Sequence, residues 1–176
     1  MYDDFKELLS VLNKHKVKYL VIGAYAVGYH AQPRATKDLD ILIQPAPKNS
    51  EAVYRALVEF GAPNIGTLTP ADFAEKGTFY RMGVPPVAID ILPEIKGVTF
   101  AAAWRNRTSV VIDTETGLAA NFISRADLIQ AKLAANRPQD IADVKALRDV
   151  AETPLPAAPK PPTRKAKPKR KPAAKP

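Results

Sequence analysis

The chain has 176 residues, carries a formal net charge of +8 and contains no cysteine. Disulfides, thiol nucleophiles and cysteine-bound zinc are therefore excluded, and two histidines are too few for a histidine-rich metal centre. Any metal ion would be held by oxygen ligands. The longest apolar stretch is too short to cross a membrane, and the acidic first residues do not resemble a signal peptide. We expect a cytoplasmic protein without a membrane partner.

The positive charge is concentrated in residues 151–176, which are also rich in proline. This segment has no apolar periodicity, so we expect a disordered, partly polyproline-like tail after a single domain over residues 1–150. The tail would attract RNA or another polyanion without sequence specificity, and a solubilising extension is the alternative. The basic residues expected to bind nucleic acid are Lys165, Lys167, Lys169, Arg170 and Lys171.

The sequence of the first half of the domain predicts alternating helices and strands. Apolar residues at helical spacing predict an amphipathic first helix, which an acidic side chain would cap. Short apolar runs separated by glycine and proline predict the strands that follow. The expected elements are a helix beginning at Asp3 or Asp4, a strand at 19–22, a helix at 24–30, a strand at 38–43 and a helix at 50–60.

The second half adds strands first and then two helices. Ser124, with Asp127 three residues later, predicts the start of the first of these helices, and Pro138 suits the first turn of the second. The pattern predicts an α/β (α+β) fold with a mixed sheet flanked by helices. The expected elements are a short helix at 70–76, strands at 78–82, 87–92 and 108–112, a helix ending near 135 and a helix from 138 to about 150.

Carboxylates interrupt two strands that are otherwise apolar. Strand side chains alternate in direction, so Asp38 and Asp40 point the same way, with Cα atoms about 7 Å apart. Burying unpaired carboxylates is costly, so this pair predicts a metal ion, a basic partner or a solvated strand end. Asp90 lies in the middle of the apolar strand 87–92 and also requires a polar site.

Three charged residues fall on or beside the apolar faces of the last two helices. Lys132 follows Leu128 by four residues and Ile129 by three, so it shares their stripe and needs an anion. Asp140 lies on the apolar face of the final helix, and Asp143 lies at the edge of that face. The alternative is that Lys132 reaches solvent, Asp140 serves the helix N-terminus and Asp143 is a surface residue.

In their order along the chain, these motifs resemble the minimal nucleotidyltransferases of the polymerase-β superfamily. The motifs are Gly23-Ala24 after a hydrophobic strand, Arg34-Ala-Thr36, Asp38-Leu-Asp40, Asp90, Lys132 and Asp140-Ile-Ala-Asp143. The resemblance covers roughly residues 17–150 and implies a nucleotidyltransferase-like mixed sheet with C-terminal helices. The segment from Lys132 to Asp143 resembles the signature of the branch that includes AbiEii-type toxin nucleotidyltransferases and related bacterial proteins.

The resemblance implies transfer of a nucleoside monophosphate from a nucleoside triphosphate to a hydroxyl group, with pyrophosphate leaving. It implies that Asp38, Asp40 and Asp90 are catalytic and bind two Mg²⁺ ions, with Mn²⁺ as an alternative. The backbone N–H groups of Gly23 and Ala24 would bind the triphosphate. The other residues expected at the nucleotide are Arg34, Thr36, Lys132, Asp140 and Asp143.

Several alternatives stay open at this point. Ala24 stands where the family has glycine or serine, so it keeps the N–H group but lacks a hydroxyl and limits close approach. A catalytically degenerate fold that binds nucleotide or nucleic acid is therefore the alternative function, as is a scaffold whose tail binds nucleic acid. Arg34 would contact phosphate or pair with Asp38, and Thr36 would order the loop. RNA such as tRNA is the favoured acceptor, with protein as the alternative, and a toxin role would imply an antitoxin partner.

Overall fold

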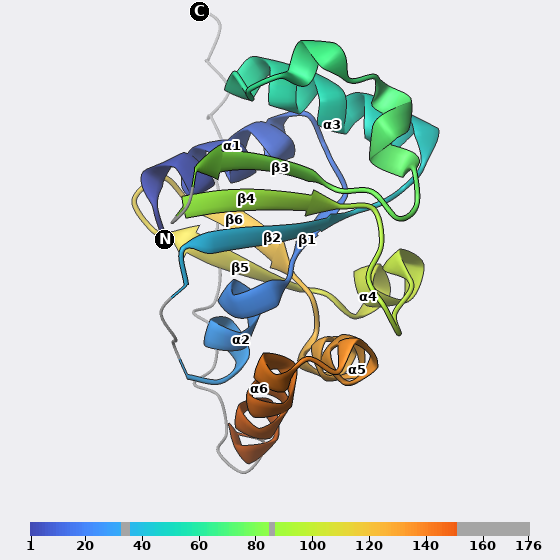
Figure 1. Cartoon of the computed structure of the whole chain (residues 1–176). Coiled ribbons are helices and arrows are strands. Elements are labelled where there is room, and N and C mark those ends of the chain that lie inside the picture. Colours follow the sequence, from blue (N-terminus) through green and yellow to red (C-terminus); the bar gives the residue numbers. More distant parts are fainter. Residues whose placement is uncertain (33–35, 85–86, 151–176) are drawn as a thin grey trace, which may run out of the picture.

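The computed structural model describes residues 1–32, 36–84 and 87–150 (Figure 1). The helices are α1 (Asp3–Lys14), α2 (Gly23–His30), α3 (Pro47–Phe60), α4 (Phe100–Asn106), α5 (Arg125–Ala135) and α6 (Pro138–Asp149), with short 3₁₀ turns at Ile65–Thr67 and Pro70–Ala74. The strands are β1 (Tyr19–Val21), β2 (Asp38–Ile43), β3 (Tyr80–Val84), β4 (Val87–Leu92), β5 (Thr108–Asp113) and β6 (Leu118–Phe122).

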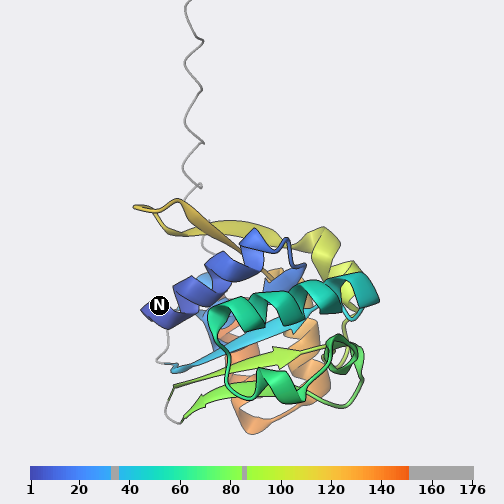
Figure 2. The ribbon, with the colours of Figure 1, turned by 90° about the horizontal axis from the view of Figure 1, so that it is seen from above.

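The described strands form one mixed sheet in the order β3-β4-β2-β1-β6-β5. Strand β2 runs parallel to β4 and antiparallel to β1, and β1 runs parallel to β6. The edge strands β3 and β5 each pair antiparallel with the strand beside them. Helices α1 and α3 lie side by side over one face of this sheet, and α2, α5 and α6 lie on the other (Figures 1 and 2).

The core forms where the apolar sides of these elements meet. Helix α1 buries the four residues that its helical spacing placed on one face: Phe5, Leu8, Leu9 and Leu12. In β2, Leu39 and Ile41 are fully buried, while the acidic residues that alternate with them are only partly buried. The alternation predicted for this strand is therefore real, and one side of β2 is apolar while the other begins with carboxylates.

The sequence patterns predicted the mixed sheet and most of its elements, with errors at some boundaries. Tyr2, rather than Asp3 or Asp4, occupies the N-cap position of α1, and both acids lie in the first turn, where they favour the helix dipole. Helix α3 begins at Pro47, three residues before the predicted start, because proline fits the first helical position. Ser124 caps α5 as predicted, and its hydroxyl accepts from the Asp127 N–H at 3.1 Å.

Two elements were missed by the sequence patterns. Strand β6 has the sequence Leu-Ala-Ala-Asn-Phe, which lacks the β-branched residues that mark a strand. Helix α4 has only seven residues, too few for a helical period to be recognised, although the Thr99 hydroxyl caps it by accepting from Ala102 N–H. No helix within the described ranges is both long enough and apolar enough to span a membrane.

Candidate active site

Three carboxylates that are far apart in the sequence meet on two neighbouring strands. Asp38 and Asp40 lie on β2, and Asp90 lies on β4. The two strands pair in parallel, and their register sets Asp40 directly opposite Asp90. Residues that are paired in this way point to the same face of a sheet, and Asp38 shares that face because it is two residues from Asp40. The sequence prediction that these three acids form one site is consistent with this placement.

Gly23 makes room for one of these carboxylates. The residue begins α2 with a φ angle of +61°, a conformation that favours glycine. A Cβ atom added to it would lie 1.8 Å from Oδ2 of Asp40, so no other residue fits there unless the carboxylate moves. The backbone holds the two residues together, because the N–H of Ile22 donates to the carbonyl oxygen of Asp40 at 3.0 Å. The Asp40 carboxylate therefore lies against the first turn of α2.

The environment of Asp40 opposes its negative charge. Burial is the largest cause, and the neighbouring charges of Asp90 and Asp38 add to it, so the pKa of Asp40 is raised to about 6. The more distant positive charges of Lys132 and Arg137 lower this pKa only in part. Among the described residues, no group donates a hydrogen bond to the Asp40 carboxylate. A positive charge placed beside Asp40 would therefore be strongly favoured.

Asp90 has a partner that the sequence did not reveal. Arg81, opposite Asp90 in the antiparallel pairing of β3 with β4, donates from Nε to Oδ1 at 2.7 Å and from Nη2 to Oδ2 at 2.9 Å. Both oxygens of this carboxylate are therefore engaged. Within the ranges that the structure describes, no three acidic or histidine side chains converge closely enough to hold a metal ion. The forked contact from Arg81 gives the Asp90 carboxylate a cation partner within the protein.

A cleft with a volume of about 740 Å³ opens beside these acids. Gly23, Asp40 and Asp90 line one side, and residues of α5 and α6 line another. The loops that precede β3 and follow β4 complete it, with Phe79 among the lining side chains. The volume lies within the range of pockets that take small-molecule ligands, so a nucleotide would fit. Asp40 and Asp90 therefore face a space large enough for the substrate that the sequence motifs predict.

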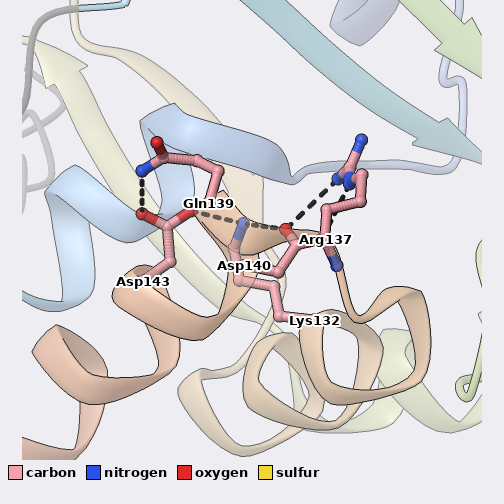
Figure 3. Close-up of polar contacts among 5 residues, drawn as sticks. All are labelled: Lys132, Arg137, Gln139, Asp140 and Asp143. Carbon is pink, nitrogen blue, oxygen red and sulfur yellow. Dashed lines mark hydrogen bonds and ion pairs between the residues drawn. The ribbon is translucent and has the colours of Figure 1, made fainter.

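Lys132 lines this cleft and is held by the two carboxylates drawn in Figure 3. Its Nζ atom donates to Oδ1 of Asp140 at 3.1 Å and to Oδ2 of Asp143 at 2.7 Å. The three side chains are almost completely buried, with exposed fractions of 7% for Lys132, 1% for Asp140 and 3% for Asp143. The alternatives that Lys132 reaches solvent and that Asp143 is a surface residue are therefore wrong. The lysine does meet an anion, as its inward position required, but that anion is a pair of carboxylates.

Arg137 completes this group, and we call Lys132, Arg137, Asp140 and Asp143 the α5–α6 charge cluster. Arg137 donates from Nε to Oδ2 of Asp140 at 2.7 Å, and its backbone N–H donates to the same oxygen at 3.2 Å. Asp140 therefore serves the start of α6, as the alternative interpretation expected. Burial alone would raise the pKa of Asp140, but the hydrogen bonds from Arg137 and Lys132 outweigh it and lower the pKa to about 2.

The sequence did not single out Arg137, which lines the cleft, or Arg81, which pairs with Asp90. The side chain of Arg137 is 74% exposed, so part of the guanidinium stays accessible at the cleft while Asp140 holds it in place. Its relation to Asp140, three residues later at a helix start, is a signal that could have found it. The position of Arg81 follows from the hairpin, since β3 ends at Val84 and β4 begins at Val87.

The remaining predicted site residues have mixed outcomes. The hydroxyl of Thr36 donates to the carbonyl oxygen of Asp38 at 3.2 Å and accepts from its N–H at 3.3 Å, so it orders the start of β2 as expected. The side chain of Ala24 is buried, with an exposed fraction of 6%. Arg34 lies outside the described residues, as do the basic residues of the tail: Lys165, Lys167, Lys169, Arg170 and Lys171.

Comparison with known families identifies the group to which this fold belongs. The family model described as "Nucleotidyltransferase of unknown function (DUF6036)" matches residues 2–156. The chain belongs to this family. No curated protein matches the sequence.

Two solved structures show the same fold at low identity. A Thermotoga maritima protein, provisionally described as a nucleotidyltransferase, is 15% identical with a TM-score of 0.55, and the match covers 84% of this chain and 89% of that one. An antigenic nucleotidyltransferase-like protein from Paracoccidioides brasiliensis is 16% identical with a TM-score of 0.52, and the match covers 82% and 73%. The nucleotidyltransferase-like fold predicted from the sequence is therefore confirmed.

Proposed function

We propose that this protein is a magnesium-dependent nucleotidyltransferase that moves a nucleoside monophosphate from a nucleoside triphosphate to a hydroxyl acceptor. The main support is the register of β2 with β4, which sets Asp40 opposite Asp90, with Asp38 on the same face, beside a cleft of nucleotide size. Membership of a nucleotidyltransferase family agrees with this chemistry. The identities to solved structures are too low to transfer an activity, so the proposal depends on the site.

The chemistry of the donor set fits a divalent cation. Carboxylate oxygens are the ligands that Mg²⁺ prefers, and the raised pKa of Asp40 shows that its charge is not balanced by the described residues. Gly23 keeps the space beside this carboxylate free of a side chain. Asp38, Asp40 and Asp90 would hold the metal, which when bound would stabilise the negative charge of the phosphate oxygens.

The chain's own groups can bind and orient the substrates. Free backbone N–H groups in the first turn of α2, at Gly23 and Ala24, suit the phosphates of the triphosphate. The accessible part of the Arg137 guanidinium suits the same charge, and Lys132 is retained as a phosphate contact because it lines the cleft. The acceptor oxygen forms a bond to the α-phosphorus, the bond to the bridging oxygen breaks with release of pyrophosphate, and Asp90 takes the hydroxyl proton.

RNA is the acceptor that we favour, because the basic residues of 151–176 would raise the encounter rate with a polyanion. Protein is the alternative acceptor. The likeness of the segment from Lys132 to Asp143 to AbiEii-type enzymes supports a further proposal, a toxin role with an antitoxin partner. One observation favours a second function, binding without catalysis: the side chain of Ala24 is buried and offers no hydroxyl to a phosphate.

The direct test is transfer of label from each α-³²P nucleoside triphosphate, with Mg²⁺, to total RNA or total protein. We expect transfer by the wild-type chain and none by the double variant Asp38→Asn/Asp40→Asn. The labelled fraction identifies the acceptor class. A chain ending after residue 153 should keep the chemistry and capture RNA less well. If no nucleotide supports transfer, yet triphosphate binding still requires Mg²⁺, the protein is a binding fold and the transferase proposal is wrong.

A further inference from the structure

Arg81 contacts Asp90, the third carboxylate of the site, which would otherwise be available to a metal ion. Its guanidinium contacts both oxygens of Asp90, at 2.7 Å and 2.9 Å, in the forked geometry that arginine forms with carboxylates. The two residues face each other across β3 and β4, so the strand register brings the two side chains together. Arg81 therefore engages both oxygens of Asp90 and offsets part of the charge that would attract a metal ion.

The acids of the site differ in the hydrogen bonds that they accept. Asp40 accepts no hydrogen bond from any described residue, whereas Asp90 accepts two from a single cation. Hydrogen bonding to Asp90 is the largest cause that raises the pKa of Arg81, and the charges of Asp38 and Asp40 raise it further. The guanidinium thus lies in the field of all three carboxylates while contacting one of them.

Arg81 is also placed so that it can leave Asp90 without disturbing the fold. It belongs to the edge strand β3, and half of its side chain, 51%, is exposed to solvent, while the Asp90 side chain is 14% exposed. A long exposed side chain can adopt another rotamer at small cost. Asp90, fixed in the sheet, would then become available to a second cation.

We propose that Arg81 is a positioning residue that sets the order of metal binding: the first divalent ion binds at Asp38 and Asp40, and a second binds only when the guanidinium releases Asp90. This inference rests on the proposed function, since it concerns the same carboxylates. The physical basis is competition, because the forked guanidinium occupies a lone pair on each oxygen of Asp90 and its positive charge repels a cation that approaches the same carboxylate. Arg81 would therefore weaken the second site relative to the first.

The experiment counts Mn²⁺ ions bound to the full chain, measured by electron paramagnetic resonance of the free ion at pH 7.5. The variant Arg81→Gln removes the positive charge and keeps a polar side chain on the edge strand. The matched control is Arg55→Gln, which removes an exposed arginine that pairs with Glu51 on α3. Asp38→Asn/Asp40→Asn defines binding outside the site. Thermal unfolding of each variant shows that it is folded.

We expect two sites of unequal affinity in the wild-type chain. In Arg81→Gln, the second site should bind Mn²⁺ about tenfold more tightly. This factor corresponds to the lower end of the free energies of hydrogen bonds to charged groups, because Arg81 is half exposed. Arg55→Gln should match the wild type. Equal binding by wild type and Arg81→Gln, with both dependent on Asp40, would overturn this inference and leave the proposed function intact. Mn²⁺ binding no stronger than in the double aspartate variant would overturn both. If Arg81→Gln does not fold, Arg81→Lys replaces it, with a smaller gain expected because lysine cannot form the fork.

Discussion

Asp40 and Asp140 line opposite parts of one cleft and differ in how their charge is balanced. In the α5–α6 charge cluster, Asp140 receives hydrogen bonds from Lys132 and Arg137, and its pKa falls to about 2 despite its burial. On the sheet, Asp40 receives none from the described residues, and burial with two acidic neighbours raises its pKa to about 6. The same residue type is therefore part of the scaffold at one wall and available to an external cation at the other.

This difference in charge balance also means that the two groups contribute differently to the stability of the fold. Removing the cation from a buried, paired group leaves its carboxylates uncompensated, which is strongly destabilising. Neutralising a carboxylate that lacks a partner removes repulsion and should stabilise the fold instead. Substitutions of Lys132 and of Asp40 should therefore change stability in opposite directions.

The largest effect is expected on activity. Asp40→Asn should lower nucleotidyl transfer by about 10³-fold or more, because the amide keeps the shape of the side chain and loses the charge that a divalent ion requires. The measurement is the initial rate of label transfer with saturating Mg²⁺. Asp113→Asn is the control, since Asp113 lies on the edge strand β5 and pairs with Lys6 of α1. A variant at position 40 that retained wild-type activity would remove Asp40 from the site.

Breaking the charge cluster should have the largest effect on stability. Lys132→Met leaves Asp140 and Asp143 buried without their shared cation, which should lower the free energy of unfolding by about 3–5 kcal/mol. The control Lys145→Met removes an exposed lysine from α6 and should change it by less than about 0.5 kcal/mol. Urea unfolding measures both. A small loss in Lys132→Met would show that solvent or rearrangement compensates the two acids.

Alanine substitutions at Gly23 and Gly61 separate the cost of a steric clash from the cost of backbone strain. Gly23 and Gly61 both have positive φ angles, +61° and +75°, but a Cβ at Gly61 would meet no atom within 4 Å. Gly61→Ala should therefore cost only the strain, about 1 kcal/mol, whereas Gly23→Ala should cost roughly 2–3 kcal/mol and displace the Asp40 carboxylate. Urea unfolding and label transfer measure the two consequences. Equal losses of stability would mean that Asp40 moves aside without cost.

The smallest effect is a dependence of stability on pH. The native state binds the proton of Asp40 more tightly than the unfolded state does, so the contribution of Asp40 to stability is greatest below pH 4 and is lost as the pH rises through about 6. Without divalent ions, Asp40→Asn should match the wild type near pH 4.5 and be more stable by about 1–2 kcal/mol at pH 7.5. Added Mg²⁺ should stabilise the wild type alone. A constant difference across this range would contradict the raised pKa.

Local patterns were enough to find the acids of the site but could not show their partners. The alternation around Asp38 and Asp40 is a property of one strand, and it placed both on one face. The alignment of Asp40 with Asp90 depends on a pairing between strands fifty residues apart, which no local period encodes. The resemblance of the motifs to a known family supplied that connection.

Partners supplied by tertiary packing were the least predictable. Lys132 was correctly expected to face inward, but its anions come from the next helix, and only the packing of α5 against α6 shows that both carboxylates reach it. Arg81 carries no signal of its own because it lies on an edge strand and is half exposed. Strand β6 was missed because its pairing with β1 and β5 selects its conformation, while its residues have little strand propensity.

The most direct test of this account is the anomalous diffraction of Mn²⁺ in crystals grown with a non-hydrolysable nucleoside triphosphate. The account predicts a peak bound by Asp38 and Asp40, with the triphosphate in the cleft and no peak between Asp140 and Asp143. A cleft that holds the triphosphate without metal at Asp40, or a peak within the α5–α6 charge cluster, would contradict the distinction between unpaired and paired carboxylates.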